Sequence, residues 1–314
     1  MKLTRGRINL TPWPQGCVVT LGNFDGVHLG HQAVLAQTAR AGEQRNLPVV
    51  AITFEPLPRE FFAPHAPVAR LTRLRERYLF IQRLGLLDEL VVLRFDRALA
   101  NMSADDFVQS ILVKKLNARH IVIGDDFRFG AGRRGDFDLL ERLGQKWGFT
   151  VEAADTFMLE GVRVSSTKVR MALNRGAMDE AASLLGRPFT LCGHVTHGDE
   201  RGRQLGFPTA NVALQRRQSP LHGVYIVATA RPRTQALHYG VANVGCRPTV
   251  GGTRARLEVH LFDFYDSLYG EVLEVRFLHH IRDERRFESL PSLIAQIKND
   301  VQVARNWLAK HNLS

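Results

Sequence analysis

The sequence predicts an α/β domain built on a parallel sheet, followed by a small antiparallel β-barrel domain with a C-terminal helix. Its 314 residues are too many for one typical hydrophobic core and suit two. In the first part, short β-branched runs alternate with amphipathic helical segments, whereas strands separated by glycine and proline turns fill the second. Gly186-Arg187-Pro188 separates the two patterns, because glycine ends a helix and proline cannot continue one. We therefore expect domains at residues 1–186 and 187–314.

The predicted elements of the first domain alternate between strand and helix. Val18–Leu21 is typical of a buried strand, and Gln32–Arg45 has the spacing of the helix after it. Ser103 is expected to cap a later helix, with Asp106 three residues on at a capping-box position. Further strands are expected at Val49–Phe54, Leu90–Leu93 and His120–Gly124, and helices at Thr72–Leu84, Ser103–Leu116, Phe137–Trp147, Ser166–Leu173 and Met178–Leu185.

The second domain changes to the two-residue periodicity of antiparallel strands. Its last segment, Pro291–Lys310, is an amphipathic helix whose apolar stripe is expected to pack on the barrel. The strands are expected at Phe189–Val195, Val224–Thr229, Gly240–Val244, Leu257–Leu261 and Val272–Leu278, and the stripe consists of Leu293, Ile294, Ile297, Val301 and Ala304.

The composition is that of a cytoplasmic protein with anionic partners. No apolar run approaches the roughly 18 residues that span a bilayer, and the N-terminus lacks the pattern of a signal peptide. Cys17, Cys192 and Cys246 are far apart and odd in number, which indicates a reducing compartment. The net charge of +11 points to nucleic acid or nucleotides without choosing between them, because the basic residues are scattered along the chain.

Two segments of the first domain are suited to binding phosphate. Gly22–His31, with the sequence GNFDGVHLGH, runs from the first strand into the first helix, where glycines admit a phosphate and the helix terminus offers free N–H groups. His28 and His31 can point from this turn toward one anion. Arg163–Arg170, RVSSTKVR, places three hydroxyls and two cations at a helix start. Taken singly, the first segment also suits a glycine-rich loop with hydrogen-bonded histidines, and the second an ordinary capped helix.

Together with GDDFRFG at Gly124–Gly130, these segments resemble the FMN adenylyltransferase module of the bacterial bifunctional riboflavin kinase/FAD synthetases, a Rossmann-like HxGH nucleotidyltransferase domain. The implied reaction is attack of the FMN phosphate on the α-phosphorus of ATP, with Mg²⁺ accompanying the ATP. Many relatives have Asn where this chain has Asp126, which only accepts hydrogen bonds when ionised. The resemblance implies that His28 and His31 are catalytic, that Gly22, Asn23, Phe24, Gly30, Ser165, Ser166, Thr167 and Arg170 contact ATP, and that Asp125, Asp126 and Arg128 bind the flavin.

A third segment, Gly206–Asn211 with the sequence GFPTAN, carries oxygen donors in the second domain. Thr209 and Asn211 lie on the same side of an extended stretch and can share a hard cation such as Mg²⁺. Glu258 belongs to an alternating strand and shares a face with His260. Beside the Thr/Asn pair it could take a proton from a hydroxyl, although exposed strand glutamates and polar turns are common.

These features, with LHGVYIVATA, GVANVGCRPTV and LEVHLFDF, resemble the riboflavin kinase module of the same enzymes, which implies that the barrel is six-stranded. The resemblance implies that Thr209 and Asn211 bind Mg²⁺ and ATP phosphates, with Gly198 and Gly206 nearby, and that Glu258 is the base for the ribityl 5′-hydroxyl. Arg285 and Phe287 then belong to a loop that closes over the flavin. The implied substrates are ATP, riboflavin and FMN, and the product is FAD.

Two other interpretations remain open at this point. An HxGH nucleotidyltransferase for pantetheine phosphate or nicotinamide mononucleotide leaves the GFPTAN half unexplained. A basic barrel that binds nucleic acid accounts for the charge, but it predicts basic and aromatic residues gathered on one face. Aromatic residues make up only 8% of the chain and fall mostly within apolar runs, so we expect neither nucleic acid nor a membrane as partner. The oligomeric state cannot be read from these features.

Overall fold

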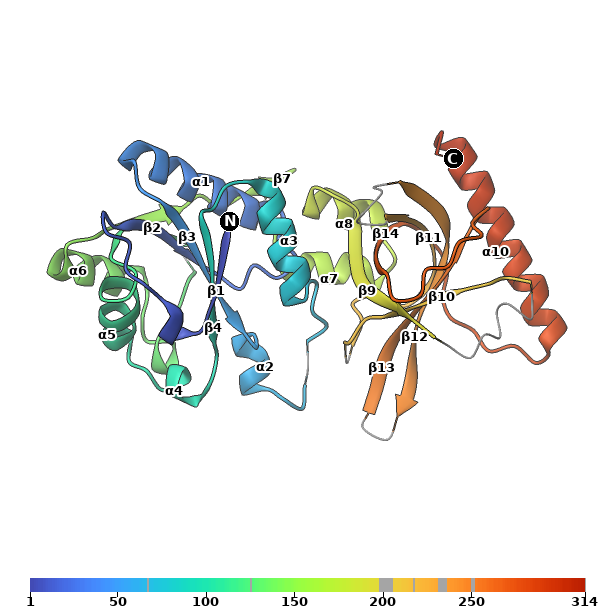
Figure 1. Cartoon of the computed structure of the whole chain (residues 1–314), viewed down its shortest axis with the longest axis horizontal. Coiled ribbons are helices and arrows are strands. Elements are labelled where there is room, and N and C mark those ends of the chain that lie inside the picture. Colours follow the sequence, from blue (N-terminus) through green and yellow to red (C-terminus); the bar gives the residue numbers. More distant parts are fainter. Residues whose placement is uncertain are drawn as a thin grey trace. The chain divides into compact units, whose positions relative to one another are not determined.

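The computed structural model describes residues 1–66, 68–124, 126–197, 206–216, 218–230, 236–249 and 252–313, with the backbone alone at 246–249 and 252–254. The chain divides into two compact units, which are described separately. The first consists of Met1–Val68 and Thr72–Ser165, and the second of Ala69–Leu71 and Ser166–Ser314 (Figure 1).

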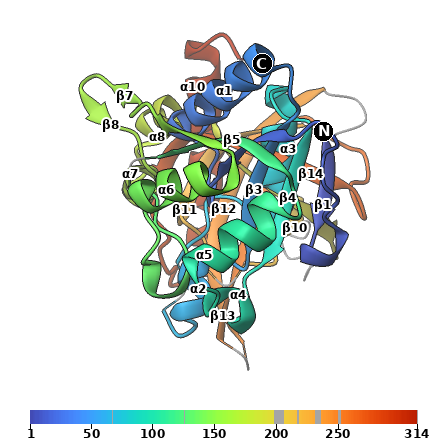
Figure 2. The ribbon, with the colours of Figure 1, turned by 90° about the vertical axis from the view of Figure 1, so that its left-hand side faces the viewer.

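The first unit is a parallel sheet between two layers of helices (Figure 2). The sheet order is β1-β4-β3-β2-β5-β6. Its strands are β1 (Lys2–Arg5), β2 (Cys17–Leu21), β3 (Val49–Glu55), β4 (Glu89–Arg94), β5 (Ala118–Gly124) and β6 (Thr150–Ala154), and a small hairpin of β7 (Met158–Leu159) and β8 (Val162–Arg163) follows. The helices are η1 (Arg7–Asn9), α1 (Leu29–Arg45), α2 (Pro58–Phe62), α3 (Leu74–Leu84), α4 (Arg97–Ala100), α5 (Ala104–Phe107), η2 (Val108–Val113), η3 (Ala131–Arg133) and α6 (Phe137–Trp147).

Alternation along the strands explains the two helical layers. On β3, Val50 and Ile52 join one hydrophobic cluster with residues of α5, η2 and α6. Val49 and Ala51, which point to the other side, join a second cluster with residues of α1 and α3. Strand β3 is therefore apolar on both faces, as a strand covered by helices on both sides requires.

The strand order places a topological switch point next to β2. From β2 the chain continues to β3 and β4 on one side, and it later adds β5 and β6 on the other. The loops after β2 and β5 thus leave the same edge of the sheet and diverge. In open α/β sheets, ligands bind in the crevice outside the carboxyl ends of the strands at such a point.

The second unit is a closed barrel with the order β10-β13-β12-β11-β14-β9. Helix α10 packs on its outer surface, where Ala304 and Leu308 are buried against Ile226 and Val241. The strands are β9 (Phe189–Thr196), β10 (Ala210–Ala213), β11 (Gly223–Ala230), β12 (Leu237–Thr249), β13 (Gly252–Leu261) and β14 (Val272–Arg282), and the helices are α7 (Ser166–Asn174), α8 (Met178–Leu185) and α10 (Leu290–Lys310).

The predicted fold class is confirmed, with differences in individual elements. The expected helix at Ser103–Leu116 is instead the short α5 followed by a π-helix, although Ser103 does cap it by accepting from the Asp106 N–H at 3.0 Å. Helix α1 begins at Leu29 rather than Gln32, because His28 serves as its N-cap. The sixth barrel strand, β10, is only four residues long, which is too short for periodicity to reveal. Helices α7 and α8 group with the barrel, and the predicted domain boundary at Gly186 stays a prediction.

Candidate active sites

The turn between β2 and α1 is held in a conformation that its residues do not favour. Phe24 and Val27 have φ of 48° and 44°, and Gly26 has φ of 89°. A left-handed β-branched residue such as Val27 is a genuine outlier, at a cost of about 1–3 kcal/mol, and such strain concentrates at functional sites. Both apolar side chains are 1% exposed, so burial of Phe24 and Val27 offsets the strain.

Hydrogen bonds to Thr72 complete the support of this turn. The Thr72 N–H donates to Asp25 Oδ1 at 2.9 Å, and the Gly26 N–H donates to Thr72 Oγ1 at 2.9 Å. Thr53 Oγ1 donates to the Asn23 carbonyl at 3.2 Å, and Arg77 Nη1 donates to Thr53 at 2.7 Å. Asp25 and Thr72 are 3% and 1% exposed, so these bonds are shielded from competing water.

His28 and His31 stack on each other at the start of α1. Their ring centroids are 3.6 Å apart with an interplanar angle of 19°. His28 Nδ1 accepts from the His31 N–H at 3.3 Å, so the neutral His28 ring carries its proton on Nε2. Gly30 admits this arrangement, because a Cβ there would lie 3.2 Å from the His28 ring and 3.3 Å from the Val164 carbonyl. The HxGH spacing thus brings two imidazoles and a helix N-terminus to one place.

The electrostatic environment keeps His31 neutral. Burial, the neighbouring His28 ring and the Arg77 guanidinium hold the pKa of His31 well below its ordinary value of 6.5. His31 Nδ1 is buried and has no hydrogen-bond partner within the described part of the chain. A buried polar atom without a partner is costly, and a phosphate oxygen is a suitable acceptor for a neutral imidazole N–H.

The loop after β5 meets the β7–β8 hairpin through one ion pair. Arg163 Nη2 donates to Asp126 Oδ2 at 3.0 Å, and both side chains are largely exposed. Arg128 is exposed on the same loop and donates to the Phe127 carbonyl. Asp125, also predicted to bind flavin, lies outside the described residues. Asp126 therefore lies in the loop after β5, on the switch-point edge, as an acceptor already paired with a cation.

The serine- and threonine-rich motif lies where α7 begins. Ser165 ends the first unit, and α7 starts at Ser166, with Thr167 exposed in its first turn. Arg170, predicted to contact ATP, donates from Nε to the Ala69 carbonyl at 2.8 Å. One of its nitrogen atoms is thus committed to the backbone.

In the barrel, strand register brings the predicted kinase residues into one row. Asn211 lies opposite Glu258, Glu258 opposite Asn243, Asn243 opposite Val224, and Val224 opposite Arg282. Residues directly opposite on neighbouring strands share a face. Four polar side chains from β10, β13, β12 and β14 therefore point to the same surface of the barrel.

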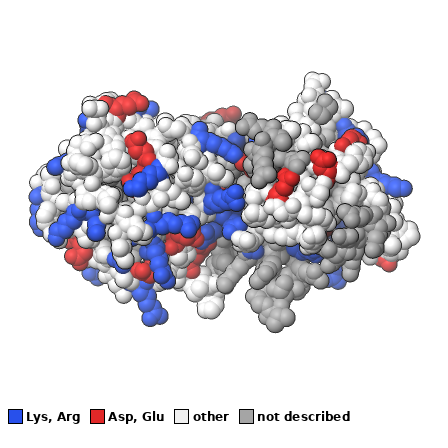
Figure 3. All heavy atoms as spheres, viewed as in Figure 1, with Lys and Arg blue, Asp and Glu red and all other residues white. Residues whose placement is uncertain are grey.

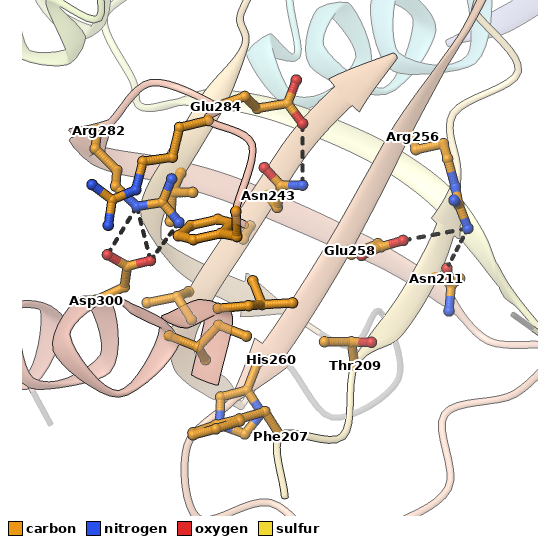
Figure 4. Close-up of a pocket in the computed structure, with 17 residues that line it drawn as sticks. Phe207, Thr209, Asn211, Asn243, Arg256, Glu258, His260, Arg282, Glu284 and Asp300 are labelled. Atoms are coloured by element: carbon orange, nitrogen blue, oxygen red, sulfur yellow. Dashed lines mark hydrogen bonds and ion pairs between the residues drawn. The ribbon is translucent and has the colours of Figure 1, made fainter. Parts of the chain in front are cut away.

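This row lines a cavity of about 420 Å³ beneath the N-terminal half of α10 (Figure 4). Leu293 and Ile297 of α10 supply apolar walls, and Thr209 and His260 extend the polar wall. Its volume suits a small organic ligand. The predicted residues Thr209, Asn211, Glu258, Arg285 and Phe287 all line this cavity, as do Phe207, Asn243, Arg256, Arg282, Glu284 and Asp300, which the sequence did not single out as site residues.

Arg256 orients the candidate base. Its Nη2 lies 3.3 Å from Glu258 Oε1 and 3.5 Å from Asn211 Oδ1, as Figure 4 shows. Glu258 and Arg256 side chains are each 35% exposed, so the carboxylate is both held and accessible from the cavity. Arg256 escaped the sequence analysis because RLEVHL shows an alternating strand without showing which residues lie beside Asn211.

The end of β14 and the loop that follows it, up to Phe287, are fastened to α10. Arg282 makes three hydrogen bonds of 2.8–3.0 Å to the Asp300 carboxylate. Gln296 donates to the same carboxylate at 2.6 Å and accepts from Arg285. The Arg285 guanidinium lies 4.9 Å from the centre of the Phe287 ring, in cation–π contact. These contacts hold Arg285 and Phe287 at the cavity.

A second cavity of about 340 Å³ meets the first at Thr209. Phe264, Tyr265 and Tyr269 supply aromatic walls, and the Tyr269 ring stacks on His197 with centroids 4.0 Å apart. Thr209 thus lies between two hollows, one with a carboxylate and one with aromatic rings. Gly206 comes just before the shared segment, whereas Gly198 lies outside the described residues.

Neither a metal cluster nor a membrane span accompanies these sites in the residues that are described. No group of three or more His, Cys, Asp or Glu side chains is arranged to hold a metal ion there. Across that same part of the chain, no helix is long and apolar enough to cross a bilayer. On the face in Figure 3, basic and acidic side chains are interspersed rather than gathered in one stripe.

A strained turn at a helix N-terminus in one unit and a carboxylate-bearing cavity in the other are the two candidate sites, and they suit a transferase that uses nucleotides. Comparisons with known proteins agree. A FAD synthetase family model matches residues 11–168 and a riboflavin kinase model residues 185–308. The chain is 50% identical over 308 residues to a bifunctional riboflavin kinase/FMN adenylyltransferase of Escherichia coli K12, with 98% of both chains covered, and 43% identical over 305 residues to that of Haemophilus influenzae, with 97% of this chain and 98% of the relative covered. It belongs to the bifunctional riboflavin kinase/FMN adenylyltransferase family.

A solved structure matches nearly the whole chain. It covers 98% of this chain and 100% of its own, at 33% identity and a TM-score of 0.83. Its title describes a macrolide-efflux protein from Streptococcus pneumoniae. The likeness supports the fold of both units. The two family models and the curated relatives agree that the chain belongs with the riboflavin kinases and FAD synthetases.

Proposed function

We propose that the HxGH turn of the first unit adenylylates FMN and that the Glu258 cavity of the second phosphorylates riboflavin, both with ATP. The protein is a riboflavin kinase and FMN adenylyltransferase, which makes FMN from riboflavin and then FAD. The observation that carries the assignment of sites is the register row, which gathers Asn211, Glu258 and the loop with Arg285 at one cavity.

Adenylyl transfer needs alignment and charge stabilisation rather than a base. The FMN phosphate is already an anion when it attacks the α-phosphorus, and pyrophosphate leaves. His28 donates from Nε2 and His31 from a ring N–H to phosphate oxygens, while N–H groups at the start of α1 face the same charge. A neutral His31, stacked on His28 at 3.6 Å, can donate without the repulsion that two imidazolium ions would suffer. Ser165, Ser166, Thr167 and Arg170 bind the remaining phosphates.

Riboflavin phosphorylation does need a base, because its nucleophile is a neutral alcohol. Glu258 accepts the proton of the ribityl 5′-hydroxyl as the oxygen attacks the γ-phosphorus, and ADP leaves. Arg256 holds the carboxylate in place at 3.3 Å. The riboflavin ring occupies the larger cavity between Phe287 and the apolar residues of α10. The smaller, aromatic cavity takes the adenine, so the triphosphate passes Thr209.

Mg²⁺ fits the oxygen donors at Thr209 and Asn211, where the two cavities meet. Thr209 and Asn211 present a hydroxyl and an amide oxygen, and Mg²⁺ is commonly bound by few protein oxygens together with substrate phosphates and water. Thr209 and Asn211 would hold it, where it would offset phosphate charge. Such a site does not require the acidic cluster that is lacking among the described residues.

The test is to incubate the protein with riboflavin, ATP and Mg²⁺ and to separate the flavins by chromatography. FMN is expected first and FAD after it, and FMN supplied directly is expected to give FAD. A chain that adenylylates pantetheine phosphate or nicotinamide mononucleotide but leaves FMN unchanged would contradict the proposal. Asn211→Ala is expected to lower phosphorylation and to raise the Mg²⁺ concentration it requires, without effect on FMN adenylylation.

A further inference from the structure

Arg77 of α3 is a charged side chain buried completely inside the first unit, and neither proposed reaction uses it directly. Its side chain is 0% exposed. Its Nη1 donates to Thr53 Oγ1 at 2.7 Å and to the Phe54 carbonyl at 3.4 Å, and its Nη2 lies 3.7 Å from Glu55 Oε2. These three residues are the last three of β3. Because an arginine stays charged at any ordinary pH, burying it is costly unless its contacts compensate, and here those contacts gather at one strand end.

The end of β3 borders the HxGH turn. The Gly22 N–H donates to the Ile52 carbonyl of β3 at 3.0 Å, and Thr53 Oγ1 donates to the Asn23 carbonyl at 3.2 Å. Thr53 is 0% exposed, so water does not compete for its hydroxyl. The strand thus holds the first two residues of the turn, immediately before the left-handed Phe24.

Arg77 fixes the direction of the hydrogen bond that Thr53 makes. A hydroxyl can donate one proton and can also accept, whereas a guanidinium only donates. Arg77 therefore occupies a lone pair of the Thr53 hydroxyl and leaves its proton for the Asn23 carbonyl. A turn that its own residues disfavour depends on such external bonds, so the loss of Arg77 would weaken the support of the turn.

The charge of Arg77 also acts on a functional histidine. Burial, the His28 ring and the Arg77 guanidinium, in that order, lower the pKa of His31. The protein interior screens charges less than water does, so a buried guanidinium acts more strongly on its surroundings than an exposed one. Arg77 is thus coupled to two parts of the HxGH motif, to Asn23 through Thr53 and to His31 through its charge.

We propose that Arg77 is a positioning residue for adenylyl transfer. It holds the end of β3, Thr53 holds the Asn23 carbonyl, and the turn then presents its two histidines to ATP. This inference rests on the proposed function of the HxGH turn. All the contacts that carry it lie within the first unit, so riboflavin phosphorylation in the barrel is expected not to depend on Arg77.

The test uses the full chain and measures FAD formation from FMN and FMN formation from riboflavin in parallel. Arg77→Met keeps much of the side-chain length and removes both the donors and the charge. It is expected to lower kcat for FAD formation roughly 10- to 100-fold, the scale of a small misalignment of reacting groups. KM for ATP and FMN is expected to change less than kcat, and riboflavin phosphorylation is expected to stay unchanged. Arg77→Lys is expected to recover much of the rate, because an ammonium keeps the charge and can donate to Thr53.

Substitutions of Thr53 test the same contact from its other side. Thr53→Val keeps the shape of the side chain and removes the hydroxyl, so it is expected to reproduce most of the loss in kcat, whereas Thr53→Ser is expected to retain the rate. The double variant of Arg77→Met and Thr53→Val is expected to be little worse than Arg77→Met alone, because both act through one hydrogen bond. Thr20→Val is the matched control. Thr20 is also a 0% exposed threonine of this sheet, and its hydroxyl has no hydrogen-bond partner within the described residues, so its replacement is expected to change neither activity.

A control for stability separates positioning from folding. Leu140→Ala removes a 1% exposed side chain of α6 from the hydrophobic cluster on the other face of the sheet. It is expected to destabilise the first unit through lost packing. At a temperature where the variant is still folded, it is expected to form FAD with kcat close to that of the wild type. A loss of kcat as large as that of Arg77→Met would overturn the inference, because destabilisation alone would then explain both variants.

Normal FAD formation by Arg77→Met would overturn the inference, and so would an equal loss of both activities. If Arg77→Met does not fold, Thr53→Val decides, and FAD formation at the wild-type rate by that variant would overturn the inference. His28→Ala separates this failure from that of the proposed function. If His28→Ala abolishes FAD formation while the Arg77 and Thr53 variants do not affect it, the HxGH turn is the site and only the role of Arg77 is wrong. If His28→Ala also makes FAD normally, the assignment of the HxGH turn itself fails.

Discussion

Glu258→Gln separates the two chemistries within one molecule. The substitution keeps the length of the side chain and an oxygen that Arg256 can still reach, but the amide cannot accept the ribityl proton. The ion pair that it weakens has an N–O distance of 3.3 Å and side chains 35% exposed, so its loss is expected to change the free energy of unfolding by at most about 1 kcal/mol. A lost general base lowers the rate by roughly 10²–10⁴-fold. That corresponds to about 2.7–5.4 kcal/mol in the activation free energy.

The assay is paired, with riboflavin in one reaction and FMN in the other. Phosphorylation of riboflavin is expected to fall by that factor, while adenylylation of FMN continues at the wild-type rate because that step needs no base. Glu180→Gln is the matched control, because Glu180 also forms an ion pair with an arginine of the second unit, Arg175, outside the cavity. If Glu258→Gln phosphorylates riboflavin at the wild-type rate, Glu258 is not the general base. Loss of both activities would show that the two sites are not independent.

Four other predictions follow from the two sites and their supports. Replacing His28 or His31 by Ala is expected to slow FAD formation at least about tenfold and to let FMN accumulate from riboflavin; normal FAD yield from the double variant would refute the roles. Asp300→Asn is expected to cost about 3 kcal/mol of unfolding free energy and to raise KM for riboflavin, because Arg282 loses its partner; unchanged denaturation and KM would contradict this. Burial and the Arg45 charge lower the pKa of His120, so the stability of the first unit is expected to be full above pH 6.5 and to decline as pH falls toward the lowered pKa, and His120→Gln is expected to flatten that profile in acid denaturation. Scission near Gly186 is expected to leave a C-terminal fragment that still phosphorylates riboflavin, and an unfolded fragment by circular dichroism would show a shared core.

The fold class and the candidate residues of both sites were available from local patterns. The change of periodicity after Leu185 separates helical from strand spacing, and GNFDGVHLGH carries glycines and histidines that act within a single turn. Because such a turn is built from neighbouring residues, the motif that marks it lies in consecutive positions of the sequence. GFPTAN and Glu258 were likewise visible, although nothing in the sequence placed them beside each other.

Only the tertiary structure decided which distant residues meet. Strand register set Asn211 opposite Glu258 and brought Arg256 to both, and a slip of one residue would have turned each side chain to the other face. The pairing of Arg282 with Asp300 joins the end of β14 to helix α10, which are distant in the sequence. Arg216 donates a hydrogen bond to the Arg70 carbonyl, 146 positions away in the sequence, and no periodic pattern predicts such a contact. Local sequence determines the elements and their reactive groups, whereas register and packing determine which of those groups share a site.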